Sequence, residues 1–271
     1  MFYLAPVGYA VVKSFFTVTR ESTYAGANEV FSGLDNYGAA LADGGFTSSL
    51  GRVLFFGVVQ IPVMLGLALV LALVLDSGTV RLVRFLRLGI FLPYAIPGAI
   101  AAIMWGFFYA PNLSPINQVL SPLGIQPDLL SGEVILYSIA NITTWTFTGY
   151  NMLILYSSLR AIPPELYEAA RLDGASSWAI AWRIKVPLIA PSLVLTAVFS
   201  IIGTFQLFTE PQVMASVSSA IGSAYTPSMA AYAQISAQNF GLGAAMSVIV
   251  TVVIGLLSAV FFRVTRNRAA L

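Results

Sequence analysis

The chain lacks cysteine and histidine altogether in its 271 residues. Their absence excludes disulfides, thiol nucleophiles, Cys/His zinc sites and histidine-based catalytic triads, so no metal or catalytic site is expected. Charge is scarce as well: 9% of the residues are charged, against roughly 25% in ordinary soluble domains. Most of the chemistry of soluble enzymes is therefore excluded.

Apolar residues dominate what is present. They make up 58% of the chain, and the mean hydropathy is +0.85. The 13 basic and 11 acidic residues leave a net charge of +2, too small to indicate a nucleic-acid partner. These values predict an integral membrane protein whose partner is the lipid bilayer. No GK[ST] phosphate-binding loop is present, so any ATP is expected on another chain.

Long uncharged runs predict the membrane spans, because a spanning helix needs about 20 mostly apolar residues. We predict an all-α fold, a single transmembrane domain over residues 1–271. The six predicted spans are residues 2–18, 53–75, 88–110, 134–159, 186–209 and 240–262. The first run is short, and a signal peptide is its alternative interpretation. A basic leader and a cleavage pattern before Glu21 are missing, which favours a span.

Basic residues predict the orientation. Ten of the thirteen lie between the second and third runs, between the fourth and fifth, or after the sixth. Lysine and arginine concentrate on the cytoplasmic side of membrane proteins. We therefore expect both termini and the 160–187 loop to face the cytoplasm.

The 160–187 loop has a pattern of its own. Pro164 can begin a helix, and Glu165 and Glu168 then fall in its first turn, where carboxylates suit the helix dipole. Asp173-Gly174 predicts a turn, and Ser176 or Ser177 can cap a second helix that ends at Pro187. We predict two short helices joined by a sharp turn. An amphipathic segment on the membrane surface is the alternative, although its polar face would be richer in Lys and Arg.

Several motifs resemble one known family. Glu168-Ala169-Ala170, Asp173-Gly174-Ala175 and Val186-Pro187 are similar to the EAA loop of binding-protein-dependent ABC importer permeases. Residues 33–37, 92–97 and 205–208 resemble elements of the maltose and glycerol-phosphate type subfamily. Two departures are Ser114, where glycine is common, and residues 214–217, which replace a Gly-rich element. The resemblance implies an ATPase-coupling role for Glu168, Ala169, Ala170, Asp173, Gly174, Ala175 and Pro187.

Polar side chains inside the predicted spans are expensive unless they pair or line a path. Seven of them lie within Asn141–Asn151. Helix–helix contact is the alternative role for each. The resemblance implies that the spans on both sides of the loop contact a sugar, which gives a candidate substrate path of Tyr150, Ser200, Thr204 and Gln206. Glu210, at the outer end of the fifth span, has two interpretations, a lining of the entrance or a marker of the membrane interface, and we favour the second.

The resemblance also implies an assembly in a bacterial inner membrane. Its partners are a second permease subunit, two ATP-binding subunits that hold ATP and Mg²⁺, and an extracytoplasmic solute-binding protein. This chain would carry no cofactor and catalyse no reaction, and the solute would be sugar-like. An amino-acid or peptide importer and an ion-coupled secondary transporter are the alternatives. A membrane-embedded enzyme is a third, and it lacks a convergent set of reactive groups.

Overall fold

The structure, a computed structural model, describes residues 4–19, 28–78, 80–111 and 113–269. Its first half consists of α1 (Leu4–Lys13), β1 (Phe16–Thr19), β2 (Asn28–Phe31), α2 (Asp35–Ala42), α3 (Gly44–Asp76), α4 (Val83–Ala95), α5 (Gly98–Tyr109), α6 (Pro115–Leu120) and a 3-10 turn (Ser121–Leu123). Its second half consists of α7 (Ile135–Arg160), α8 (Glu165–Leu172), α9 (Ser177–Ile180), a π-helical turn (Ala181–Lys185), α10 (Val186–Leu188), α11 (Ala190–Phe205), α12 (Thr209–Met214), α13 (Pro227–Ser236) and α14 (Phe240–Ala269).

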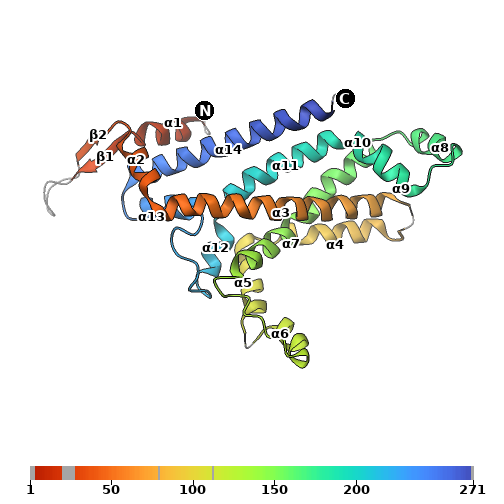
Figure 1. Ribbon diagram of the computed structural model, residues 1–271, viewed down its shortest axis with the longest axis horizontal. Helices are drawn as coiled ribbons and strands as arrows, with labels where there is room; N and C mark the ends of the chain where they lie inside the picture. Colours follow the sequence, from red (N-terminus) through yellow and green to blue (C-terminus); the bar gives the residue numbers. More distant parts are fainter. Residues whose placement is uncertain (1–3, 20–27, 79, 112, 270–271) are drawn as a thin grey trace.

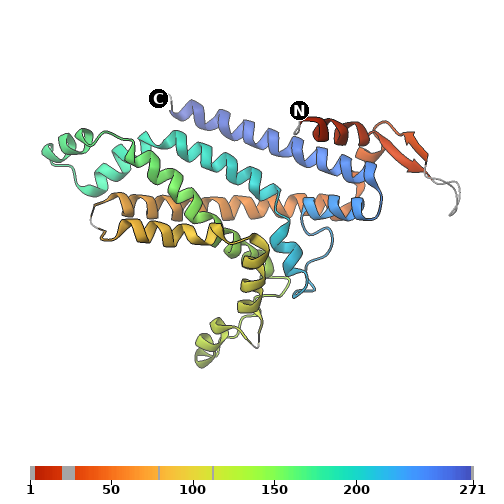
Figure 2. The same cartoon turned by 180° about the vertical axis from the view of Figure 1, so that it is seen from behind.

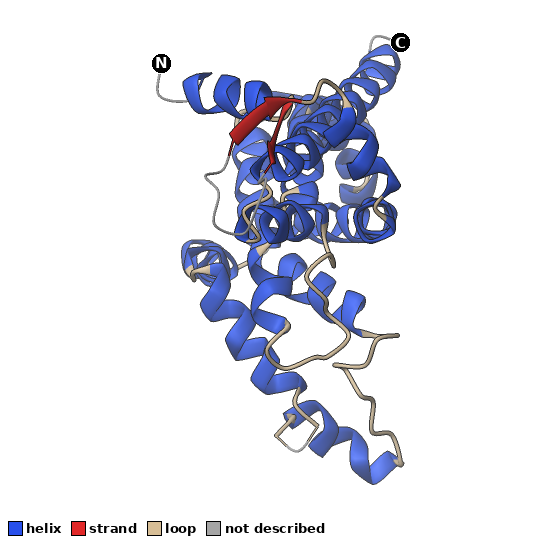
Figure 3. Ribbon diagram, turned by 90° about the vertical axis from the view of Figure 1, so that its left-hand side faces the viewer, coloured by secondary structure: helices blue, strands red, loops and turns tan. Residues whose placement is uncertain are grey.

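Long helices form the body of the molecule. In Figure 1 and in the reverse view of Figure 2, α3, α4, α7, α11 and α14 run lengthwise through it. The β1–β2 hairpin and α1 lie at one end, and α8 and α9 project at the other. Figure 3 shows α6 at the tip of an arm away from the bundle. Helices suit a membrane because they satisfy their own backbone groups.

Three described helices are long and apolar enough to cross a membrane: Gly44–Asp76, Ala190–Met214 and Phe240–Thr265. The α4–α5 pair is a fourth if it counts as one span. α7 is not among them although it has 26 residues, because its polar residues lower its hydropathy. The mostly helical membrane fold is confirmed, while the structure supports three or four spans by length and composition and not the full six.

Residues 88–110, predicted as one span, do not form one continuous helix. α4 and α5 meet at an angle of 94°. Ile96 is extended, with φ −81° and ψ 128°, because the residue before a proline is disfavoured in the α region. Pro97 then becomes the N-cap of α5. The chain turns sharply where the sequence shows an unbroken apolar run.

The first predicted span, 2–18, is also not a single helix. Residues 1–3 lie outside the described residues, α1 ends at Lys13, and residues 16–19 pair with 28–31 as an antiparallel hairpin. Asn36 holds this arrangement, since its amide donates to the carbonyls of Ser14 and Phe16, both at 2.9 Å. A ten-residue helix rises about 15 Å, half the thickness of a hydrocarbon core of about 30 Å.

Two other boundaries differ from the prediction. α3 begins at Gly44 rather than at residue 53, because the Asp43 carboxylate caps it there by accepting from the Phe46 amide at 2.9 Å. Arg52 therefore lies inside the helix, where it donates to the carbonyl of Tyr225 at 2.7 Å. The span 186–209 is interrupted: α10 ends at Leu188, α11 ends at Phe205, and α12 begins at Thr209. The spans 134–159 and 240–262 agree closely with α7 and with most of α14.

α4 and α7 cross at very short range. A Cβ atom on Gly149 of α7 would lie 2.0 Å from the carbonyl oxygen of Ile90 in α4. Glycine at this position lets the two backbones touch, and the contact fixes the wall formed by α4 and α7. Interhelical contacts through small residues are typical of membrane bundles.

Gly149→Ala should therefore destabilise the purified protein by about 3 kcal/mol, the upper end for overpacking. Gly66→Ala in α3 is the matched control, because a Cβ atom there meets nothing within 4 Å and alanine is the better helix former. Thermal unfolding of both variants in the same detergent measures the effect. Equal melting temperatures for Gly149→Ala and the unaltered chain would contradict the tight crossing.

Candidate functional site

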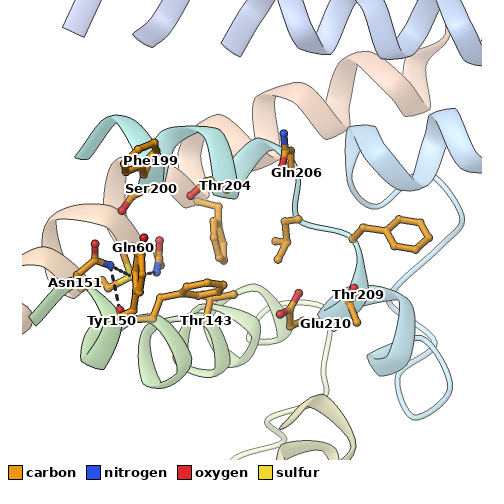
Figure 4. A pocket seen from close by; sticks show the side chains of 16 residues that line it. Gln60, Thr143, Tyr150, Asn151, Phe199, Ser200, Thr204, Gln206, Thr209 and Glu210 are labelled. Atoms are coloured by element: carbon orange, nitrogen blue, oxygen red, sulfur yellow. Dashed lines mark hydrogen bonds between the residues drawn. The ribbon is translucent and has the colours of Figure 1, made fainter. Parts of the chain in front are cut away.

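A cavity of about 370 Å³ lies between α3, α7 and α11, next to the start of α12. The four residues of the predicted substrate path, Tyr150, Ser200, Thr204 and Gln206, all line it. The other lining residues are Phe56, Gln60, Met64, Thr143, Phe147, Asn151, Phe199, Gly203, Leu207, Phe208, Thr209 and Glu210. Sequence segments far apart therefore converge on one partly polar space (Figure 4).

Two amides and a thioether form one end of the cavity. The Gln60 amide of α3 donates to the sulfur of Met64 at 3.3 Å, and the Asn151 amide of α7 donates to the same sulfur at 3.7 Å. Gln60 also reaches the hydroxyl of Thr144 at 3.4 Å. The amide donors link α3 to α7. Figure 4 shows Tyr150 and Ser200 at this same end.

Tyr150 has a neighbour that the sequence did not suggest. Its ring stacks on the ring of Tyr94 in α4, with centroids 4.7 Å apart and planes inclined by 20°. Tyr94 also meets Phe147 edge to face at 5.8 Å. One face of the Tyr150 ring is thus occupied by protein. The residue still lines the cavity, so packing and cavity lining are combined in one side chain.

Hydroxyls along the cavity bond first to their own helices. Ser200 donates to the carbonyl of Thr196 at 2.8 Å, and Thr143 donates to that of Ile139 at 3.2 Å. Such bonds fix the hydroxyl and leave its lone pairs as acceptors. Two other polar residues of α7 do not line the cavity: Asn141 donates to the Tyr109 hydroxyl at 2.8 Å, and Thr148 to the carbonyl of Thr144 at 2.6 Å. Asn141 thus joins α7 to α5, as the helix-contact interpretation expects, whereas the bond of Thr148 stays within α7.

The carboxylate of Glu210 lies at the opposite end of the cavity. Glu210 is in the first turn of α12, and its side chain is buried, with 9% exposed. Figure 4 shows it pointing into the space between α7 and the junction of α11 and α12. Glu210 therefore lines the cavity, in agreement with the alternative interpretation of the sequence, and its position at the membrane interface stays a prediction.

The 160–187 segment folds as the pattern predicted. α8 covers Glu165–Leu172, Gly174 turns the chain with φ +81°, and the Ser176 hydroxyl accepts from the Ala179 amide at 3.2 Å at the start of α9. The second helix does not end at Pro187 as predicted. A π-helical turn over Ala181–Lys185 follows α9 and leads into α10, which contains Pro187 and ends at Leu188. The residues assigned to coupling are Glu168, Ala169, Ala170, Asp173, Gly174, Ala175 and Pro187, of which Ala170 and Ala175 are half-buried and the others exposed.

A buried ion pair ties this segment to α3. Lys185 donates to the carboxylate of Asp76 at 2.6 Å, and Arg160 of α7 lies 3.9 Å from the same carboxylate. The Lys185 ammonium also lies 4.7 Å from the ring centre of Tyr167 in α8. Burial, with the nearby Asp76 carboxylate, raises the pKa of the Tyr167 phenol. Asp76 was missed by the sequence reasoning, although it is the one acid that ends the second apolar run.

Metal binding finds no support in the part of the chain that the structure describes, where no group of three or more acidic side chains gathers. The site therefore consists of a cavity with hydrogen-bonding and aromatic groups, and of an exposed two-helix segment at the far end of the same helices. Neither part contains a nucleophile paired with a base. The arrangement can bind and release a polar solute and can contact another protein.

Two transport permeases are similar to this chain over most of its length. The sn-glycerol-3-phosphate transport system permease protein of Agrobacterium fabrum is 31% identical over 273 residues, covering 99% of this chain and 90% of that protein. The lactose transport system permease protein of Rhizobium radiobacter is 31% identical over 216 residues, covering 78% and 70%.

A solved bacterial ABC transporter involved in the import of the acidic polysaccharide alginate has a similar fold, with a TM-score of 0.81 at 18% identity. The match covers 98% of this chain and 90% of that one. Residues 37–269 match the family described as the binding-protein-dependent transport system inner membrane component. The chain therefore belongs to the binding-protein-dependent transport system inner membrane components, the permease family of ABC importers.

Proposed function

We propose that this chain is the transmembrane permease subunit of an ATP-driven importer for a sugar or a sugar-like solute. One observation carries the proposal: within a chain of this family, the cavity that Tyr150, Ser200, Thr204 and Gln206 share is lined by aromatic rings, amides and hydroxyls. A carbohydrate has apolar ring faces and polar edges, and a site of this composition complements both.

The relatives support the same class of solute. They include permease proteins named for sn-glycerol-3-phosphate, for lactose and for sulfoquinovosyl glycerol. An amino-acid substrate fits the cavity less well, because its carboxylate needs a cation and the described lining residues include no Lys or Arg. An ion-coupled transporter would use an intramembrane acid such as Glu210, but the family depends on a binding protein instead.

The proposed assembly contains further chains. A related alginate ABC transporter was solved in complex with a pentasaccharide-bound periplasmic protein, which supports delivery of the solute from outside the inner membrane. We assign to this importer a second permease subunit and two ATP-binding subunits that hold ATP and Mg²⁺. ATP-driven closure of those subunits would rock the two permeases between inward-open and outward-open states.

α8 and α9 form the proposed contact with the ATP-binding subunit. Glu168 and Ala169 are exposed on α8, and the turn at Gly174 is open to close approach, since a Cβ atom there would meet nothing within 4 Å. The Lys185–Asp76 pair joins the base of this segment to α3. A movement of α8 and α9 would therefore be transmitted to α3 and α7, the two helices that border the cavity.

The orientation completes the proposal. The end of the molecule that carries α8 and α9 faces the cytoplasm, together with both termini, and the β1–β2 hairpin end faces outward. Five full crossings would then be made by α3, the bent α4–α5 pair, α7, the α11–α12 pair and α14, and α1, with its rise of about 15 Å, would form the outer half of a sixth. The basic residues near Arg84 and Arg160, at the α8 end, support this assignment.

Gly174→Leu should leave the protein in the membrane and reduce sugar uptake and binding-protein-stimulated ATP hydrolysis by about tenfold or more. A leucine at φ +81° is strained by about 1–3 kcal/mol and adds bulk to the proposed contact. Gly78→Leu is the matched control, with φ +74° and similar open space outside the 160–187 segment. Wild-type uptake and ATP hydrolysis in Gly174→Leu would contradict the coupling role.

Lys185→Met should lower the stability of the purified complex by about 3–5 kcal/mol, because Asp76 keeps a buried charge without its nearest partner. Arg183→Met is the control, because it replaces an exposed basic side chain by methionine two residues away. It should change the stability of the complex little. Melting temperatures of both variants measure the difference. Equal melting temperatures for Lys185→Met and Arg183→Met would show that the ion pair does not hold the segment to α3.

Single cysteines test the orientation without background from this chain, which has none of its own. We expect Leu34→Cys to react with a membrane-impermeant thiol reagent added outside spheroplasts, and Ser177→Cys to react only after lysis. Both positions are exposed in this subunit, so access through the membrane decides the labelling when the subunit is expressed without the ATP-binding subunits. Labelling of position 177 in intact spheroplasts would contradict the proposed topology.

A further inference from the structure

The cavity described above contains one charged side chain among the residues that the structure describes, the carboxylate of Glu210. The remaining lining groups are amides, hydroxyls, a thioether, aromatic rings and aliphatic groups. A solute with a phosphate or a carboxylate would meet a like charge here and find no Lys or Arg from this chain. Like charges brought together away from bulk water are strongly unfavourable.

One neighbour of Glu210 stabilises a negative charge on its carboxylate. Gly98 is the first residue of α5, and a Cβ atom on it would lie 3.1 Å from Glu210 Oε1. The carboxylate thus lies against the N-terminal end of a twelve-residue helix, which carries a partial positive charge. The missing side chain of Gly98 is what admits the carboxylate to this position. The helix end therefore offsets part of the cost of burying a negative charge at the cavity wall.

We propose that Glu210 makes this cavity selective for solutes without a negative charge, such as uncharged saccharides or polyols whose hydroxyls donate hydrogen bonds to the carboxylate. The inference rests on the proposed function, because it names the substrate class of the same cavity. It separates this chain from importers of phosphorylated or acidic sugars. In such an importer a basic group would replace or neutralise the carboxylate.

The test measures the charge in the cavity directly, without the natural solute. Ser200→Cys places a single thiol of this chain on the cavity wall, and the complete transporter is assembled around it in lipid nanodiscs. The probes are methanethiosulfonate reagents of similar size with a trimethylammonium, a sulfonate or a hydroxyl head group. The reaction rate of each reagent at position 200 is measured from the increase in mass of this subunit. Each rate is then divided by the rate of the same reagent with free mercaptoethanol, which removes differences in intrinsic reactivity.

In the Glu210 background the cationic reagent should react faster than the anionic one. Glu210→Gln should lower this preference about tenfold, because a unit charge in a medium of low dielectric constant attracts the cationic reagent and repels the anionic one. Glu210→Asp keeps the charge and should keep the preference. Glu133→Gln makes the same substitution at an exposed residue before α7 and should leave the preference unchanged.

The rate of the neutral reagent should be equal in all variants, which separates charge from altered access or misfolding. An unchanged preference in Glu210→Gln, or faster reaction of the anionic reagent with Glu210 present, overturns the proposal. So does failure of all three reagents to reach position 200 in both nucleotide-free and ATP-trapped complexes. Sugar uptake by the unaltered complex is measured in parallel, so that a transporter without charge selectivity is distinguished from a chain that is not a sugar permease.

Discussion

Backbone groups in hydrocarbon must find partners inside the protein, and this constraint decides where the long helices can break. Two such breaks lie at Ile96–Pro97 between α4 and α5 and at residues 206–208 between α11 and α12. At the second break the hydroxyl of Ser228 donates to the carbonyl of Phe205 at 3.2 Å, so α13 satisfies a group that the helix has released. Both breaks meet where Glu210 lies against Gly98. The second break thus borders the cavity, since residues 206–210 line it.

The rest of the bundle connects this cavity to the cytoplasmic end proposed for α8 and α9. α3 and α7 pack along one another, and both contribute to the cavity wall through Gln60 and Asn151. At the other end Asp76, the last residue of α3, accepts from Lys185 beside α10. A buried ion pair is costly to break, so the segment and α3 should move as one unit. The same two helices therefore border the cavity at one end and adjoin the α8–α9 segment, the proposed contact with the ATP-binding subunit, at the other.

Local chemistry made much of this predictable from the sequence. Asp173-Gly174 predicted the turn and Ser176 the cap, because both depend on adjacent residues only. The convergence of Tyr150, Ser200, Thr204 and Gln206 followed from the family resemblance and from polar groups placed in apolar runs. The 94° bend was missed because hydropathy does not register backbone direction, although Pro97 was the signal for it. The role of Arg52 inside α3, the Tyr94–Tyr150 stack and the inward-facing Glu210 depend on partners distant in sequence, which no local pattern specifies.

The central claim is that solute passes through the cavity between α3, α7 and α11. Filling it tests this most directly. Gly203 lines the cavity, and a Cβ atom on it would meet nothing within 4 Å, so Gly203→Leu adds volume there without a clash at its base. Gly66→Leu in α3 is the control, since it has similar free space and does not line the cavity. Uptake of radiolabelled sugar into proteoliposomes should be abolished by Gly203→Leu and retained by Gly66→Leu, with both complexes assembled to equal extent. Uptake at the wild-type rate through a correctly assembled Gly203→Leu complex would contradict the account.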